Sequence, residues 1–158
     1  MLQGERIIVI DARGPLEFDP QGEISAQQLN SLSEVLSSTQ EPVTVFLHYP
    51  PIPLGCDWID QSMLVRNGTE LHEILRTHRD QVRGVFFGHI HRPMSLILDG
   101  ILYASSGSAT MHFPNWPNAT SATSACDPIA FAQLIEIGSH GVMVKPQWVV
   151  LPSAGPVG

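Results

Sequence analysis

Two histidines one residue apart are the most informative feature of the sequence. His89 and His91 stand in the segment FGHIH, directly after the apolar run Val82–Phe87. Residues i and i+2 of an extended backbone point to the same side, so both imidazoles are expected to approach one centre. Gly88 favours a sharp turn at this point because it has no Cβ. Imidazole ligands suit zinc, iron, nickel or copper, so the spacing indicates a metal site.

A third histidine follows another predicted strand end. His48 comes directly after the apolar run VTVFL, residues 43–47. In open α/β sheets, ligand sites form beyond the carboxyl ends of the strands, so two strand ends can bring His48, His89 and His91 to one region. A histidine pair alone is a weak signal, because most such pairs on protein surfaces bind nothing. The spacing therefore leaves a metal centre and an ordinary surface cluster both open.

The elements that position these residues follow from hydrophobic periodicity. Short apolar runs predict buried strands at residues 6–11, 43–47 and 82–87, and helical spacing predicts helices at residues 25–37 and 69–79. Ser25 and Gln28 form an S-x-x-Q capping box at the first helix start. Strands that alternate with helices favour parallel pairing.

The last third of the sequence predicts two antiparallel hairpins. Asp99-Gly100 separates apolar runs at residues 94–98 and 101–104, and residues 138–141 separate runs at 129–137 and 142–150. Between the hairpins, residues 105–127 read as a long functional or mobile loop. We expect one α/β domain at residues 1–151, with helices packed on a mixed sheet, and a tail at residues 152–158.

Composition restricts the partners of the protein. The chain has 158 residues, 43% of them hydrophobic, and a formal net charge of −7, so we expect a globular domain that does not bind a nucleic-acid polymer. No apolar run is long enough for a membrane helix, and no secretory signal is recognised at the start, so a cytoplasmic protein without membrane attachment is predicted. Cys56 and Cys126 fit no metal spacing and are expected to be reduced and structural.

Two segments resemble a known enzyme family. LHYPP at residues 47–51 and RGVFFGHIH at residues 83–91 resemble, in this order, the last two motifs of the calcineurin-like metallophosphoesterases. The branch most resembled is that of class III cyclic-nucleotide phosphodiesterases and glycerophosphodiesterases. IVID at residues 8–11, Gly22 and Asn67-Gly68 extend the resemblance over most of the chain. It implies the C-terminal part of a four-layer sandwich and metal-dependent hydrolysis of phosphodiesters of cyclic nucleotide or glycerophosphodiester type.

The resemblance also implies roles for individual residues. His48 and His89 resemble ligands of the second metal in a two-metal site, and His91 resembles a ligand of the first. The metals implied are divalent Mn, Fe or Zn. Tyr49 takes the place of a second histidine and is expected to shape the substrate pocket, while His112 matches a position that faces substrate in some relatives. A loop histidine in a flexible segment is the alternative for His112, and the resemblance assigns no catalytic group.

The remaining histidines are not expected to be ligands. His72 and His78 lie on the second predicted helix, and His140 lies in a hairpin turn. His78 is close to the end of its helix, where a positive charge complements the helix dipole.

The early motifs of the family have no counterpart here. Asp-x-His, the Gly-Asp pair and Gly-Asn-His do not occur, so the domain is expected to be N-terminally truncated. Two divalent cations about 3.5–4 Å apart need a bridging carboxylate to offset their repulsion, which neutral imidazoles cannot supply. Asp57 and Asp60, in the predicted loop after His48, are candidates for a ligand or for a loop cap.

Three hypotheses remain open on the sequence. The first is a hydrolase acting on a small phosphorylated substrate, with the missing ligands supplied by another chain or a longer gene product. The second is a non-catalytic remnant that binds one metal or none and serves as a structural or oligomerising domain. The third is a mononuclear three-histidine hydrolase with an open fourth position. An incomplete sandwich exposes apolar faces and strand edges, so a homo-oligomer or a complementing fragment is expected.

Overall fold

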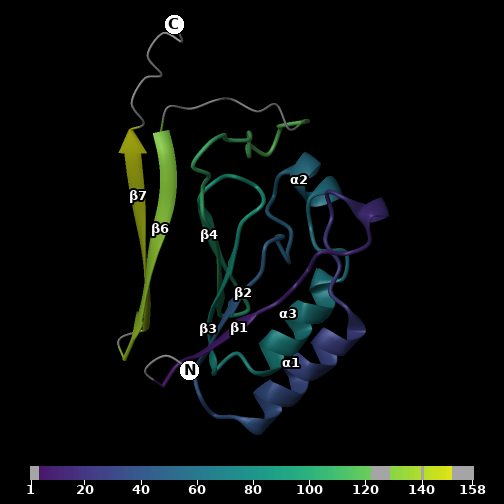
Figure 1. Ribbon diagram of the computed structural model, residues 1–158, viewed down its shortest axis with the longest axis vertical. Coiled ribbons are helices and arrows are strands. Elements are labelled where there is room, and N and C mark those ends of the chain that lie inside the picture. The colour runs from purple at the N-terminus through teal and green to yellow at the C-terminus, as the bar shows by residue number, and fades with distance from the viewer. Residues whose placement is uncertain (1–3, 122–128, 140, 151–158) are drawn as a thin grey trace, which may run out of the picture.

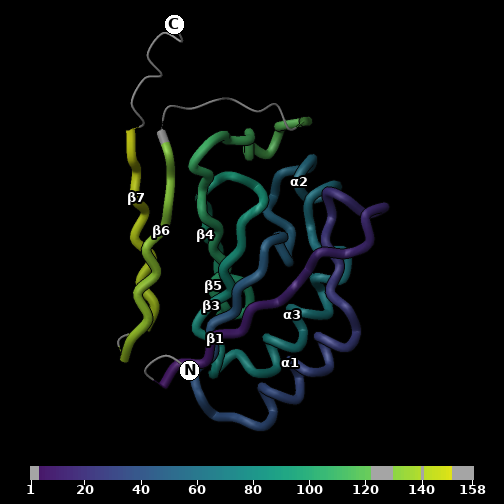
Figure 2. Tube along the Cα trace, in the orientation of Figure 1, coloured from purple at the N-terminus to yellow at the C-terminus, as the bar shows by residue number. Residues whose placement is uncertain are grey.

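The computed structural model describes residues 4–121, 129–139 and 141–150, and its fold is α/β (Figures 1 and 2). A mixed, largely parallel five-stranded sheet is combined with helices and a separate antiparallel hairpin. In chain order the elements are β1 (Arg6–Val9), the 3₁₀ turn η1 (Leu16–Phe18), α1 (Ala26–Ser38), β2 (Val43–Phe46), α2 (Asp57–Ser62), α3 (Gly68–Thr77), β3 (Val82–Phe87), β4 (Met94–Leu98), β5 (Ile101–Ser105), β6 (Ile129–Gly138) and β7 (Gly141–Val150).

The strand order of the main sheet is β1-β2-β3-β5-β4. The pairs β1–β2, β2–β3 and β3–β5 are parallel, which confirms the expectation from alternating strands and helices. β4 and β5 form the first predicted hairpin. Asp99 and Gly100 at its turn have φ values of 50° and 83°, because a tight hairpin turn needs left-handed residues there. β6 and β7 form the second predicted hairpin.

Figure 1 shows the layers of the molecule: α1 and α3 cover one face of the sheet, and the β6–β7 hairpin lies on the other side. The core joins the helices to the first face. It contains the apolar stripe of α1 (Leu29, Leu32 and Leu36), Leu71 and Leu75 of α3, and Val43, Val45 and Val85 of the sheet. Burial of these side chains fixes the orientation of β2 and β3, whose ends carry the histidines.

Several local expectations need correction. Residues 57–62, predicted as loop, form the short helix α2, which is too short to show a helical period in the sequence. Its Trp58 and Ile59 are buried, so tertiary packing stabilises the turn. Strands β1 and β2 end earlier than predicted, at Val9 and Phe46.

The capping box is half formed. Ser25 Oγ accepts the backbone N–H of Gln28 at 3.3 Å, as predicted. The Gln28 side chain binds the backbone of Asp11, and its amide reaches the Ser25 hydroxyl at 3.5 Å rather than the Ser25 backbone N–H. Tertiary contact with Asp11, which follows β1, therefore replaces the second half of the box.

No helix in the described part of the chain is long and apolar enough to cross a bilayer. Cys56 is buried and free, as predicted. The predicted tail at residues 152–158, Cys126 and His140 lie outside the described residues.

Candidate metal centre

His48 and His89 meet at the carboxyl ends of two adjacent parallel strands. Their Nε2 and Nδ1 atoms are 3.1 Å apart, although the residues are separated by 41 positions. Backbone hydrogen bonds continue past β2, because Leu47 donates to Phe86 O and Gly88 donates to His48 O. These bonds align the residues that follow β2 and β3, so both side chains leave the sheet at the same edge. The structure thus brings together two of the three predicted ligands.

The backbone of the His-x-His segment is not extended, which corrects the expectation from spacing. His89 and His91 have φ values of 68° and 54°. Left-handed conformations of residues other than glycine cost about 1–3 kcal/mol, persist only when the surroundings determine them, and cluster at functional sites. Hydrogen bonds determine them here: His89 Nε2 donates to Pro20 O at 2.8 Å, and His91 O accepts from His112 Nδ1 at 3.0 Å.

His91 packs against an aromatic side chain and lies close enough to His48 and His89 to lower their pKa values. Its ring stacks on Phe113, with centroids 4.7 Å apart and an interplanar angle of 13°. Phe113 is held edge-on by Trp58 of α2, whose indole N–H also donates to Pro114 O. His91 Nδ1 is buried and has no hydrogen-bond partner among the described residues. Buried polar atoms are nearly always paired, so this nitrogen is free to accept a ligand or a proton donor.

The geometry of the His48–His89 pair fits two ligands of one metal. Nitrogens bound at about 2.0–2.1 Å in a tetrahedral shell lie about 3.3–3.4 Å apart, close to the observed separation. Because His89 donates through Nε2 to Pro20 O, its Nδ1 carries a lone pair. Metal-binding histidines usually donate their other N–H to a carbonyl or carboxylate in this way. A cation between the rings would replace the proton that the two nitrogens now share.

Electrostatics keep both imidazoles neutral at physiological pH. Burial lowers the pKa of His89 to about 4, in spite of its hydrogen bond to Pro20 O, which favours its charged form. Partial desolvation and the proximity of His91 also lower the pKa of His48. Neutral imidazole is the form that binds metals, so His89 Nδ1 offers a lone pair directly, and His48 does so once the proton between the two rings moves to its other nitrogen.

Tyr49 and His112, predicted to face substrate, are both buried. The Tyr49 ring lies 5.0 Å from His48 and 4.5 Å from His89, measured between ring centroids. Its other side packs on Gly22, where a Cβ would lie 2.8 Å from the Tyr49 ring, so only glycine permits this approach. His112 supports the His91 backbone. Both residues thus contact the candidate ligands, whereas contact with substrate stays a prediction.

The carboxylates near His48 do not join the pair. Asp60 accepts from the backbone N–H groups of Leu54 and Gly55, which is the loop-capping role. Asp57 is exposed in the first turn of α2. Within residues 4–121, 129–139 and 141–150, no group of three or more His, Cys, Asp or Glu side chains is placed to hold a metal ion. His72 of α3 binds Tyr103 of β5 and Asp99 of the β4–β5 turn, and His78 ends α3.

Sequence reasoning missed three residues that support the site. Pro20 supplies the carbonyl for His89, and Phe113 covers His91. Asn67 binds both backbone groups of Ile24, at 3.0 and 2.8 Å, and so holds the segment that carries Pro20. An Asn before a helix predicts a cap, yet Asn67 does not cap α3. No local pattern could have revealed a contact across 43 residues.

Curated relatives of the chain are described as cyclic nucleotide phosphodiesterases. The chain is 36% identical over 103 residues to the 3′,5′-cyclic adenosine monophosphate phosphodiesterase CpdA of Escherichia coli (strain K12), covering 64% of this chain and 37% of the relative. It is 34% identical over 91 residues to a protein of Synechococcus sp. described as a probable cyclic nucleotide phosphodiesterase, covering 58% and 34%. Over about 60% of its length, the chain is homologous to proteins described as cyclic nucleotide phosphodiesterases.

A third relative extends the set to another bacterium. The 3′,5′-cyclic-nucleotide phosphodiesterase of Nostoc sp. is 34% identical over 93 residues, 58% of this chain and 34% of the relative. No family model matches the chain. The matched part is 34–37% of the length of these relatives, about a third, so whatever the rest of each relative contributes to its activity has no aligned counterpart here.

Proposed function

We propose that this chain forms part of a metal-dependent phosphodiesterase site, in which His48 and His89 ligate a divalent cation. The separation of 3.1 Å between His48 Nε2 and His89 Nδ1, at the carboxyl ends of β2 and β3, carries the proposal. The homology to cyclic nucleotide phosphodiesterases supports a small phosphodiester, such as a cyclic nucleotide, as substrate. Mn, Fe and Zn are the candidate metals, and a cytoplasmic location stays a prediction of the sequence.

Residues of the chain have distinct tasks in this site. When bound, the cation supplies Lewis-acid polarisation of a phosphoryl oxygen and lowers the pKa of water. His48 and His89 provide neutral lone pairs, and Pro20 O orients His89. The buried ring of Tyr49 excludes water from one side of the imidazole pair. His91, with an unpaired Nδ1, is the candidate for a further ligand.

A specific observation favours the second hypothesis, metal binding without turnover. In the described ranges no group of three or more His, Cys, Asp and Glu side chains is placed to hold a metal, although Asp19 is close enough to His89 to act on its pKa, and close pairs of cations need a bridging carboxylate. A single weakly held cation is then the expected state of the isolated chain. Turnover would require ligands from outside the described residues.

Metal titration of matched histidine variants tests the proposal. We expect Zn²⁺ or Mn²⁺ to bind the purified chain, and His48→Ala and His89→Ala each to weaken binding at least tenfold, since loss of even an outer-shell partner costs 10- to 100-fold. His78→Ala is the matched control, because His78 ends α3 and has no contact with the pair. Isothermal titration calorimetry and elemental analysis report affinity and stoichiometry.

Hydrolysis of bis(p-nitrophenyl) phosphate and of cyclic AMP then separates the two candidates. Turnover that disappears in both His48→Ala and His89→Ala supports the phosphodiesterase. Metal binding without turnover supports the non-catalytic domain. Binding that neither variant reduces, or no binding at all, contradicts the assignment of His48 and His89 as ligands.

A further inference from the structure

The backbone around His91 is held by a segment 21 positions further along the chain. His112 Nδ1 donates to His91 O at 3.0 Å, and Arg92 Nε donates to the carbonyl of Phe113. Ser105 Oγ of β5 donates to Arg92 O at 2.7 Å. These bonds account for the left-handed conformation of His91, because such a conformation persists only when its surroundings determine it.

The imidazole of His91 is held by a separate contact. The last torsion of a histidine side chain is broad, so a fixed backbone does not decide where the ring nitrogens point. The ring stacks on Phe113, with centroids 4.7 Å apart and planes 13° from parallel. A flat ring in stacked contact restricts rotation of the imidazole out of its plane. Phe113 therefore supplies the restraint that the backbone contacts lack.

Helix α2 holds Phe113 in place. The Trp58 ring meets the Phe113 ring edge-on, with centroids 5.9 Å apart and 82° between the planes. Trp58 Nε1 donates to the carbonyl of Pro114, the next residue, at 2.9 Å. Trp58 is 7% exposed and belongs to the hydrophobic core. The ring that stacks on His91 is thus backed by the core of the protein.

His91 lies where it can act together with the imidazole pair. It is close enough to His48 and His89 to lower the pKa of both. Its Nδ1 is buried and has no hydrogen-bond partner among the described residues. Ligands of a functional site must be held within about 0.5 Å of their working positions by neighbours that lock their rotamers. The stacked ring of Phe113 is the neighbour of His91 that meets this need.

We propose that Phe113 is a positioning residue for His91: its ring holds the imidazole in one orientation, in which His91 serves as a further ligand beside His48 and His89. The proposal rests on the proposed function, since it takes His48 and His89 as metal ligands. Phe113 carries no group that ligates a metal or transfers a proton, so its effect must pass through His91. Loss of a residue that orients a ligand typically costs 10- to 100-fold in metal affinity.

NMR of the histidine rings in the metal-free chain tests the orientation. The ring protons of His91 are expected upfield of ordinary histidine positions, because they lie against the face of an aromatic ring. Comparison with His91→Ala assigns them. Phe113→Leu keeps an apolar side chain without the ring and should return the resonances to ordinary positions, whereas Phe113→Tyr should keep the shift. Identical His91 resonances in the unchanged chain and Phe113→Leu would overturn the proposal.

Titration with Zn²⁺ tests whether this orientation serves metal binding. We expect Phe113→Leu to weaken binding about tenfold and Phe113→Tyr to restore it. In a His91→Ala background, Phe113→Leu should have no further effect, because no imidazole remains to be positioned. A merely structural role predicts the same weakening in both backgrounds. That result, or a tyrosine variant no better than the leucine variant, would contradict the positioning role.

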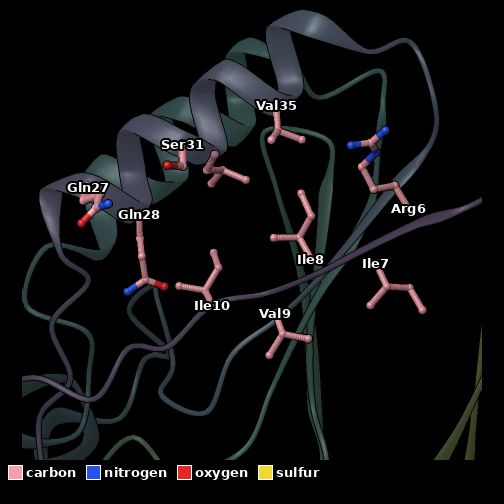
Figure 3. A pocket seen from close by; sticks show the side chains of 10 residues that line it. Arg6, Ile7, Ile8, Val9, Ile10, Gln27, Gln28, Ser31 and Val35 are labelled. Atoms are coloured by element: carbon pink, nitrogen blue, oxygen red, sulfur yellow. The ribbon is translucent and has the colours of Figure 1, made fainter. Parts of the chain in front are cut away.

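Two control variants remove packing at a distance from His91. Phe46 is partly buried like Phe113, and its ring stacks on Phe86 with centroids 5.3 Å apart, so Phe46→Leu makes the same change without touching an imidazole. Val35→Ala acts in a groove of about 580 Å³ between β1 and α1, which no histidine lines (Figure 3). Both should keep the affinity for zinc and the His91 resonances. Circular dichroism checks that each variant is folded.

The outcomes separate this proposal from the proposed function. Zinc binding that His48→Ala and His89→Ala weaken but Phe113→Leu does not would keep the proposed function and refute the positioning role. Absence of zinc binding by the unchanged chain would contradict the proposed function. The ring resonances would then decide by themselves whether Phe113 orients His91.

Discussion

Replacement of Asn67 by alanine is expected to destabilise the protein and loosen the candidate site together. The Asn67 amide donates to Ile24 O at 2.8 Å and accepts from Ile24 N–H at 3.0 Å. Ile24 is 2% exposed, so alanine would leave one buried donor and one buried acceptor without partners. Each unsatisfied buried group costs about 1–3 kcal/mol, which gives about 2–4 kcal/mol after partial relaxation.

The assay is urea unfolding followed by circular dichroism. A loss of this size corresponds to a fall in Tm of roughly 5–15 °C for a chain of this length. Asn30→Ala is the matched control, since Asn30 is exposed on α1 and alanine favours a helix. We expect the control to be neutral or slightly stabilising.

Asn67→Ala should also weaken metal binding by the His48–His89 pair. Asn67 holds the segment that carries Pro20, and Pro20 O accepts from His89 Nε2. Loss of this carbonyl would weaken metal binding without removing a ligand, by up to about tenfold. A free energy of unfolding within about 0.5 kcal/mol of the control would refute the reasoning, because it would mean that the two bonds to Ile24 contribute nothing net.

Two further predictions concern stability. Ser25→Ala should lower the free energy of unfolding by about 1 kcal/mol through loss of the α1 cap, while Ser31→Ala in the same helix should not; urea unfolding compares them. Tyr103→Phe should cost about 1–2 kcal/mol, because it leaves the buried His72 Nδ1 without its partner at 2.8 Å. Asp99→Asn keeps an acceptor for the same ring, so its free energy of unfolding should fall by less than that of Tyr103→Phe in thermal unfolding. An equal fall in the two variants would contradict this account.

Most of the secondary structure was predictable because its causes are local. Asp99-Gly100 predicts its hairpin from the left-handed conformations that the turn requires, and Ser25 predicts the start of α1 through its bond to Gln28 N–H. Apolar runs predicted β3 with its observed bounds. Helix α2 was missed, because six residues carry no period and its stability comes from buried Trp58 and Ile59.

The candidate site was predictable in its residue types but not in its geometry. Position after β2 and β3 was enough to select His48 and His89 as neighbours, since parallel strands end at one edge. The same reasoning assumed an extended backbone at His89 and His91, and the left-handed conformations of both residues make it wrong in detail.

Sequence alone therefore determined which elements form and which histidines lie at the strand ends, because propensity, turn chemistry and hydrophobic period act over a few residues. Tertiary structure decided where each imidazole points. The carbonyl of Pro20 orients His89 across 69 positions, and the ring of Phe113 stacks on His91. Such contacts depend on how distant segments pack, so no local pattern in the chain records them.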